Sequence, residues 1–451
     1  MKDLTKGYPA KVIVLFAIPL ALGNILQMLY NMVDTKIVST YVDTNALAAV
    51  GATAVVTNVL VGFLNGLTQG FSILVARSFG ARDEKRMRQY VAGNIKLTLM
   101  TAVLLTAVGF LVIEPVLHLL QTPGDIFSSA LSYVRIIFVG IIFTAIYNLC
   151  ANVLRAVGDS KTPLYCLMAS VGINTGLDLL FVAVFHWGIK GAAAATVIAQ
   201  GICAFLCAGY VLWKFHGILP KKGEWNLNRQ QYASLITTGL SMGLMGFIVN
   251  IGTVVLQGAM NTLGTKIVAA HTAGRRVFDI IMVVIYTIGF SMTTYVSQNM
   301  GAGKYDRIRQ GVRHALVIVS IETSLIIVGT YLFSHSVIAW IANSTDPVVV
   351  GNGVMYMKVG VWFFYVLGPL FILRCTLQGM GRKIIPVCSS FLEMIMKILS
   401  AAFLVPALGY FGVALTEPFS WVVMTIPLVI AYLLVISKLD PKHTTYAASC
   451  K

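Results

Sequence analysis

The most regular feature of this sequence is a succession of apolar segments, each long enough to cross a membrane, separated by short polar stretches. A helix needs roughly 20 apolar residues to span the hydrocarbon core of a bilayer. Hydrophobic residues make up 57% of the 451 residues and charged residues only 11%, too few to cover the surface of a soluble globule. We therefore predict an all-α polytopic membrane protein.

Twelve of these segments are predicted to be transmembrane helices, arranged as two pseudo-symmetric six-helix lobes. Their approximate ranges are 12–37, 46–76, 97–120, 131–154, 164–185, 191–213, 232–260, 268–298, 314–341, 351–375, 386–406 and 412–437. The first segment has full span length and no small-residue cleavage site, so we expect it to remain as a helix.

The basic residues are concentrated on one side of the predicted helices. The formal charge is +16, and basic clusters such as Arg82, Lys85 and Arg86 follow even-numbered spans, whereas the odd-numbered connections contain only Lys190 and Lys266. By the positive-inside rule, both termini are cytoplasmic and the protein is a multi-pass protein of the cell membrane. Because these residues lie in short connections rather than on one amphipathic face, the charge does not predict nucleic-acid binding.

Two copies of one segment, each roughly half of the chain, organise the sequence. Gly80–Gln89 (GARDEKRMRQ) resembles Gly301–Gln310 (GAGKYDRIRQ), and Leu154–Pro163 resembles Leu377–Pro386 at nearly the same separation. Each copy has an even number of spans, so both start on the same side of the membrane. The predicted parts are an N-terminal lobe at 1–213, a cytoplasmic linker at 214–230, a C-terminal lobe at 231–437 and a cytoplasmic tail at 438–451.

Four polar residues of the first copy are expected at nearly the same depth in the membrane. Asp34 lies about seven residues before the outer end of the first span, Asp178 about eight before the end of the fifth, and Thr196 about six after the start of the sixth. At ~1.5 Å per residue these positions are roughly 9–12 Å below the outer surface. Asn174 is one helical turn from Asp178 on the same face.

Three interpretations of this cluster are open. Two carboxylates, an amide and a hydroxyl form an oxygen-rich set suited to a hard cation. A dry pocket with two neighbouring carboxyl groups would equally favour a proton. Alternatively, Asp34 and Asp178 lie near wet helix ends and are hydrogen-bonded to neighbours, a structural role that depth alone does not exclude.

Several motifs resemble those of the multidrug and toxic compound extrusion (MATE) transporters. They are Leu15–Val38 (LFAIPLALGNILQMLYNMVDTKIV), Asn45–Ala52 (NALAAVGA), the glycine-led basic loops and Leu154–Pro163 (LRAVGDSKTP), within a resemblance that extends from about Pro9 to Ser437. The resemblance implies a transporter, not an enzyme, that exports cationic amphipathic drugs in antiport with Na⁺ or H⁺ by alternating access. It implies no cofactor, contact with membrane lipids and a monomeric protein.

The resemblance also assigns candidate residues. The N-terminal-lobe cation site of the family uses an aspartate on the first helix, an Asn and an Asp four apart on the fifth, and a threonine on the sixth. The matching positions are Asp34, Asn174, Asp178 and Thr196, which would also be the ligands of a coupling Na⁺.

Four further polar residues are candidates for lining a drug cavity. Gln27 and Tyr30 precede Asp34 on the same helical face. Asn148 and Asn152 are spaced one turn apart on the fourth span and correspond to cavity positions of the family. Alternatively, each of the four forms an interhelical hydrogen bond that holds two spans together.

The second copy departs from the family pattern in one respect. Several MATE subfamilies carry a carboxylate in the seventh helix, but Leu240–Met260 contains none, so an ion site of that type is not expected in the C-terminal lobe. Arg275 lies one turn from Asp279, and Lys397 one turn from Glu393, which predicts structural ion pairs. The remaining intramembrane acids are Glu322 and Glu417.

A flippase for lipid-linked sugars or polysaccharides is the main alternative function. It would need a cationic cavity for polyphosphates, whereas the arginines lie mostly in the connections. A membrane-embedded enzyme would need clustered catalytic groups. Gly239–Gly243 (GLSMG) fits the GxSxG pattern of nucleophilic serines, but it lies in an apolar span and, like Gly62, Gly66 and Gly70 at GxxxG spacing, predicts helix packing.

Overall fold

The computed structural model describes residues 3–42, 44–119 and 121–439, which are almost entirely helical. In this described part, eleven helices are long and apolar enough to cross a membrane. The helices α10 (Pro347–Trp362) and α11 (Phe364–Gly379), which are bent by 54° relative to each other, meet the same test only as a pair, and counting the pair as one span gives twelve. The predicted all-α polytopic architecture is confirmed.

The chain folds into two compact units that divide inside helices. The first unit contains Ile18–Gly243, and the second contains Leu4–Ala17 together with the chain from Leu244 onward. As a result, α1 (Pro9–Tyr41) and α7 (Arg229–Asn261) each contribute to both units. The lobe boundaries proposed from the sequence remain a prediction, and most of the predicted tail lies outside the described residues.

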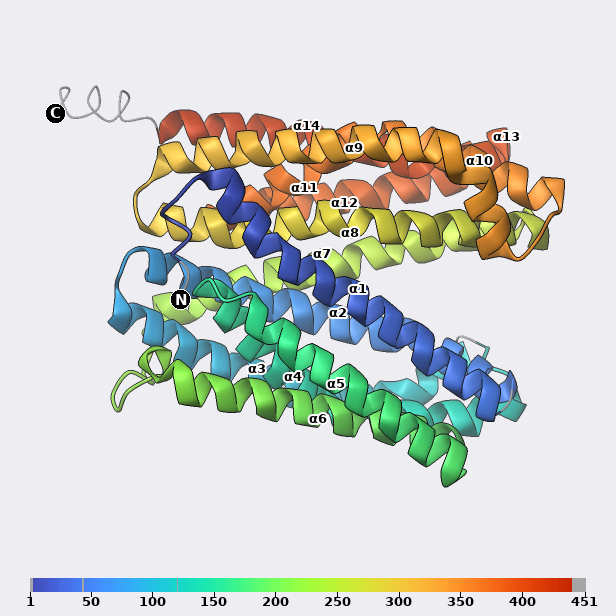
Figure 1. Cartoon of the computed structure of the whole chain (residues 1–451), viewed down its shortest axis with the longest axis horizontal. Helices are drawn as coiled ribbons and strands as arrows, with labels where there is room; N and C mark the ends of the chain where they lie inside the picture. The colour runs from blue at the N-terminus through green and yellow to red at the C-terminus, as the bar shows by residue number, and fades with distance from the viewer. Residues whose placement is uncertain (1–2, 43, 120, 440–451) are drawn as a thin grey trace. The chain divides into compact units, whose positions relative to one another are not determined.

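In the first unit, five helices lie alongside one another and are coloured blue to green in Figure 1. They are α2 (Thr44–Gly80), α3 (Glu84–Leu119), α4 (Gly124–Ala156), α5 (Lys161–Asp178) and α6 (Gly188–Lys214). α4 is the central helix, because it packs against α2, α3 and α6, and α5 packs against α6. A π-helical turn at Leu179–Val184 continues α5 beyond Asp178.

The second unit repeats this arrangement, in yellow to red in Figure 1. Its helices are α8 (Thr265–Gly301), α9 (Tyr305–Ala342), α10, α11, α12 (Ile384–Leu399), α13 (Val405–Leu408) and α14 (Tyr410–Lys438). α8 packs against α9, α10 and α11, and α12 packs against α14. A π-helical turn at Ser400–Leu404 follows α12, as one follows α5 in the first unit.

The predicted span at 351–375 is not one continuous helix. It breaks at Phe363, between Gly360 and Pro369. Glycine has low helix propensity and proline lacks a backbone N–H, so the segment between them is the weakest part of the helix. Gly360 also packs closely against the Phe278 ring. A Cβ added to Gly360 would lie 2.6 Å from Phe278 Cε2, so no larger residue fits there without a shift.

The residues before α1 are fixed to the second unit. Leu4 is 1% exposed, and its N–H donates to Gln298 Oε1 at 3.0 Å. Lys304 Nζ donates to the carbonyl oxygen of Thr5 at 2.8 Å. α1 therefore begins in the second unit, while its later residues, including Asp34, belong to the first.

α2 and α7 approach to backbone contact in the first unit. A Cβ on Gly66 would lie 2.7 Å from the carbonyl oxygen of Met242, and one on Gly70 would lie 2.6 Å from that of Thr238. No side chain fits at such distances, so the packing role predicted from the GxxxG spacing is confirmed for these two glycines. By contrast, no described atom lies within 4 Å of a Cβ built on Gly62.

A buried ion pair fixes the connection between α6 and α7 to α3. Arg88 donates from Nε and Nη2 to the two carboxylate oxygens of Glu224 at 2.8 and 2.9 Å, and the side chains are 10% and 11% exposed. These bonds, with a further one from the N–H of Lys221 at 2.9 Å, lower the pKa of Glu224 to about 2. Arg88 also contacts Glu84 at 3.2 Å, but the Glu84 side chain is 78% exposed.

Gly70→Ala is expected to lower the unfolding temperature of the purified protein, because the added methyl group would push α2 away from the Thr238 carbonyl. Overpacking of this kind typically costs about 1–3 kcal/mol. Gly62→Ala is the matched control, since open space surrounds that position and alanine has the higher helix propensity. Equal unfolding temperatures for the two variants in a thermal-shift assay would contradict the proposed close contact.

Glu224→Gln is expected to lower the unfolding temperature at pH 7, because the buried Arg88 loses its charged partner. The pKa of Glu224 is lowered by folding, so its carboxylate stabilises the folded protein above its ordinary pKa of 4.5, and this stabilisation is lost as the pH falls to about 2. The difference between wild type and variant should shrink over that pH range. The exposed Glu84→Gln should change little, and a pH-independent difference would argue against this ion pair.

Candidate cation site

Two acidic side chains from different helices meet in the first unit. Asp34 on α1 and Asp178, the last residue of α5, are close enough for their carboxyl groups to interact directly. Asp178 is 1% exposed and Asp34 is half-buried. No donor among the described residues reaches Asp34 Oδ1 or either carboxyl oxygen of Asp178. The pair therefore offers three oxygen atoms to a proton or a cation.

Asn174 and Thr196 lie beside this carboxyl pair. Asn174 is 1% exposed, shares the buried face of α5 with Asp178, and has a side-chain Nδ2 that meets no acceptor in the described chain. Thr196 on α6 is also buried and accepts a hydrogen bond from the Tyr30 hydroxyl at 3.3 Å. The structure thus brings carboxyl, amide and hydroxyl groups from α1, α5 and α6 to the interior of one unit.

The local sequence fixes where α5 begins and ends. The Asp159 carboxylate accepts hydrogen bonds from the N–H groups of Lys161 and Thr162 at 3.0 and 3.1 Å, which satisfies donors at the start of the helix. Pro163 is compatible with this first turn, because the N–H that it lacks has no partner inside the helix there. At the other end, the π-helical turn begins directly after Asp178, and such turns are frequent at functional sites.

Tyr133 on α4 is a member of the cluster that the sequence analysis missed. Its hydroxyl interacts electrostatically with Asp34, Asp178 and Tyr30. α4 begins at Gly124, so Tyr133 lies at a distance from the helix end similar to that estimated for Asp178. The depth count would have found it, but the predicted fourth span began at residue 131 and placed Tyr133 at its edge.

The two candidate cavity residues on α1 have different surroundings. Tyr30 is half-buried and bonds to Thr196, so it adjoins the carboxyl pair directly. Gln27 is exposed, and its Nε2 donates to Asn31 Oδ1 on the same helix at 3.4 Å. Of the two, only Tyr30 is in contact with the candidate cation site.

The two candidate cavity residues on α4 form hydrogen bonds to α2. Asn148 Nδ2 donates to Asn65 Oδ1, and Asn152 Nδ2 donates to Thr68 Oγ1 at 3.1 Å. Asn152 and Thr68 are buried, whereas Asn65 is exposed. The interhelical hydrogen bonds considered as an alternative are therefore present, and a role in lining a cavity remains a prediction.

Three acidic residues inside the spans of the second unit have basic partners, whereas Glu322 on α9 forms no ion pair among the described residues and no donor reaches its Oε2. Arg275 Nε lies 2.9 Å from Asp279 Oδ1, and Lys397 Nζ lies 2.9 Å from Glu393 Oε1. Both predicted ion pairs are confirmed. Arg275 also donates to Glu417, an interaction between α8 and α14 that the sequence analysis did not identify.

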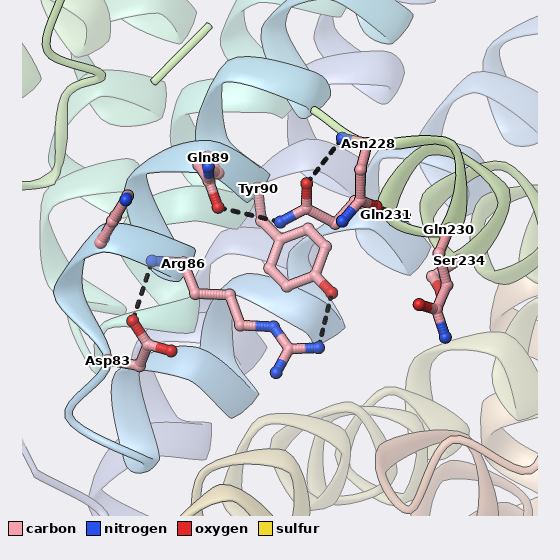
Figure 2. A pocket seen from close by; sticks show the side chains of 9 residues that line it. Asp83, Arg86, Gln89, Tyr90, Asn228, Gln230, Gln231 and Ser234 are labelled. Atoms are coloured by element: carbon pink, nitrogen blue, oxygen red, sulfur yellow. Dashed lines mark hydrogen bonds between the residues drawn. The ribbon is translucent and has the colours of Figure 1, made fainter. Parts of the chain in front are cut away.

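A polar cavity of about 380 Å³ lies elsewhere in the first unit, between the α2–α3 connection and the start of α7. Figure 2 shows Asp83 accepting a hydrogen bond from the N–H of Arg86 at 3.0 Å, and Gln231 donating to Gln89 at 2.9 Å. Arg86 Nη2 also donates to the Tyr90 hydroxyl at 3.4 Å. None of the candidate cation-site residues lines this cavity.

Comparison with known proteins identifies the family. A family model described as MatE matches residues 19–180 and 241–403. The starts of the two matched segments, at residues 19 and 241, are separated by nearly the same distance along the chain as Gly80 and Gly301 of the sequence copies. Each segment covers most of one copy.

Curated relatives match along most of their length. The probable multidrug resistance protein YpnP of Bacillus subtilis is 28% identical over 385 residues, which is 85% of each chain. The probable multidrug resistance protein NorM of Thermotoga maritima is 23% identical and covers 87% of this chain and 85% of its own. A FAD transporter of Shewanella oneidensis is 24% identical, with coverage of 89% and 90%.

Solved structures share the fold. A crystal structure of MATE in the bent conformation superimposes with a TM-score of 0.90 at 22% identity, covering 98% of each chain. A MOP superfamily transporter from Pyrococcus furiosus gives a TM-score of 0.86 at 21% identity. Because the MatE model matches both halves of this polytopic helical protein, the chain belongs to the MatE family and is a membrane transporter, not an enzyme.

Proposed function

We propose that this protein is a secondary active multidrug efflux transporter, which exports cationic amphipathic compounds in antiport with Na⁺ or H⁺ by alternating access. The observation that carries this proposal is the carboxyl pair of Asp34 and Asp178, three of whose oxygens meet no donor among the described residues. Two ionised carboxyl groups inside a membrane protein repel each other and are costly to desolvate. A proton or Na⁺ bound between them removes both costs, so the site favours cation uptake.

The neighbouring residues would complete the coordination of the ion. Sodium, a hard cation, prefers oxygen ligands, which the side-chain carbonyl of Asn174 and the hydroxyl of Thr196 supply. A proton would need only the two carboxyl groups, which share it. Both ions are cargo that passes through the site, and the proposal requires no resident cofactor.

Cation binding would reach the drug through α1. The helix carries Asp34 and the candidate cavity residues Gln27 and Tyr30, so a change in its packing alters the cavity and the ion site together. Pro19 is the proposed flex point, because it removes one hydrogen bond of the helix near the place where α1 passes between the compact units. By linkage, a drug that disfavours the cation-bound packing is released when the cation binds. Asn148 and Asn152 are proposed as the α4 contribution to the same cavity.

The proposed location is the cytoplasmic membrane, with both termini in the cytoplasm and the protein acting as a monomer among its lipids. The basic connection that includes Arg82, Lys85 and Arg86 supports this orientation through the positive-inside rule. Uptake of the cation at Asp34 would then take place from the outer side.

A flippase for lipid-linked sugars is the principal alternative, and the FAD transporter among the relatives is named for an anionic cargo. An anionic polyphosphate would require uncompensated basic residues inside the spans. Arg275 is paired with Glu417 and Asp279, and Lys397 is paired with Glu393. Arg374 on α11 is buried and donates from Nη2 to Ser389 Oγ at 3.0 Å, so it forms no ion pair among the described residues. The pairs of Arg275 and Lys397 leave little free positive charge for a polyphosphate.

Asp34→Asn is expected to abolish cation-driven efflux while the protein remains folded in the membrane, because the neutral amide cannot exchange a proton or bind Na⁺ with a full charge. The assay follows efflux of a fluorescent cation from vesicles, with Na⁺ and pH gradients imposed separately. Glu114→Gln is the control, since Glu114 is an exposed acid on α3 that pairs with Arg135 at 3.3 Å. Full efflux by Asp34→Asn under both gradients would refute the assigned role.

Thr196→Val is expected to raise the cation concentration needed for half-maximal efflux by about tenfold, since one hydrogen-bonding oxygen is worth about 1.4 kcal/mol. The maximal rate should change less. Thr175→Val is the matched control, because the Thr175 hydroxyl bonds to the Val171 carbonyl of its own helix at 3.0 Å. Identical cation dependence of the two variants would remove Thr196 from the proposed site.

A further inference from the structure

The two compact units contain equivalent helices at the position of the cation site. α5 and α12 are each followed by a π-helical turn, and each turn leads to a glycine with positive φ, Gly188 at 59° and Gly409 at 58°. These glycines occupy the same place in the two sequence copies. Gly188 lies as many residues after Gly80 as Gly409 lies after Gly301. Residues of the second unit can therefore be assigned as counterparts of the cation-site residues in the first.

The burial pattern fixes the register between α5 and α12. Four buried positions of α5 recur with identical spacing on α12, where they are also buried. They are Pro163, Cys166, Ser170 and Asn174 on α5, and Pro386, Ser389, Glu393 and Lys397 on α12. Lys397 thus occupies the position of Asn174, and Glu393 that of Ser170.

Two further members of the first cluster have counterparts. Tyr133 on α4 corresponds to Tyr356 on α10, because the two tyrosines are as many residues apart in the sequence as Asn174 and Lys397. Thr196 on α6 corresponds to Glu417 on α14, because they are as many residues apart in the sequence as the two positive-φ glycines, Gly188 and Gly409. Tyr356 donates to Glu417 Oε2 at 3.3 Å, so the two counterparts are in contact.

The counterpart cluster contains basic groups of the protein itself. The Lys397 ammonium lies 2.9 Å from Glu393 Oε1 and donates to Thr253 Oγ1 on α7, also at 2.9 Å. The Lys397 and Glu393 side chains are only 4% and 12% exposed. Arg275 donates to Glu417, whose side chain is 14% exposed. Lys397 and Glu417 also interact electrostatically, so the two ion pairs belong to one cluster.

We propose that the second unit holds a counterpart of the cation site in which the Lys397 ammonium and the Arg275 guanidinium permanently replace the exchangeable cation. In the first unit the carboxyl oxygens lack donors and must take their positive charge from solution. In the second unit the positive charges are covalently attached. This cluster therefore exchanges no cation, an inference that rests on the proposed function and extends it by specifying where no exchange occurs.

Removing the attached ammonium should create a site for a cation from solution. The test uses Asp34→Asn/Asp178→Asn as the parent, so that the carboxyl pair of the first unit contributes nothing, and adds Lys397→Ala. Thermal unfolding of the purified protein is measured in equal concentrations of sodium, methylammonium and choline chloride. The parent with Lys397→Ala is expected to unfold several degrees higher in methylammonium, and higher in sodium, than in choline, because a ligand that binds only the folded state stabilises it.

Two comparisons decide the outcome. Adding Glu393→Gln should abolish the salt-specific stabilisation, because the carboxylate that holds the cation is gone. If the alanine variant does not fold, Lys397→Gln removes the charge while filling most of the space.

A folded Lys397 variant that unfolds at the same temperature in all three salts would overturn the inference. Specific stabilisation of the parent itself would overturn it too, since the second unit would then already bind a cation. Neither result depends on whether Asp34→Asn abolishes drug efflux, which is the separate test of the proposed function.

Discussion

An ionised carboxyl group inside a membrane-spanning bundle is stable only where a positive charge or a proton reaches it. This protein meets that constraint differently in its two units. In the second unit, Glu393 and Glu417 are paired with Lys397 and Arg275. In the first unit, Asp34 and Asp178 interact with each other, and three of their oxygens have no described donor. The proposed function assigns the missing positive charge at the first pair to a cation from outside the chain, which is the dependence that a cation-driven transporter requires.

α1 connects this requirement to the rest of the protein. Its first residues follow a segment that is fixed to the second unit through Leu4 and Thr5, whereas Asp34 belongs to the first unit. Tyr30, one turn before Asp34, bonds to Thr196 on α6. A change in the charge of the carboxyl pair would thus act on a helix whose beginning is fixed. Pro19 lies on α1 between this fixed beginning and Asp34.

Much of this organisation could be predicted from the sequence, because membrane spans and their polar exceptions produce strong signals. Eleven spans, the Asp34–Asp178 convergence and the two ion pairs were found in this way, and the GLSMG segment lies inside α7, as expected of a packing motif. Features that depend on tertiary contacts were missed. Tyr133 was hidden because α4 begins at Gly124 rather than at residue 131. The packing of Gly360 against Phe278, beside the break at Phe363, joins residues far apart in the sequence and could not be predicted from a local pattern.

The most direct test of the central claim is infrared difference spectroscopy of the carboxyl groups in the purified protein, recorded as Na⁺ is added or the pH is raised. The account predicts one protonated carboxyl band that disappears under one or both treatments and that is altered in the same way by Asp34→Asn and by Asp178→Asn. Spectra in which the two side chains respond separately, or in which neither responds to Na⁺ or pH, would contradict a shared cation site.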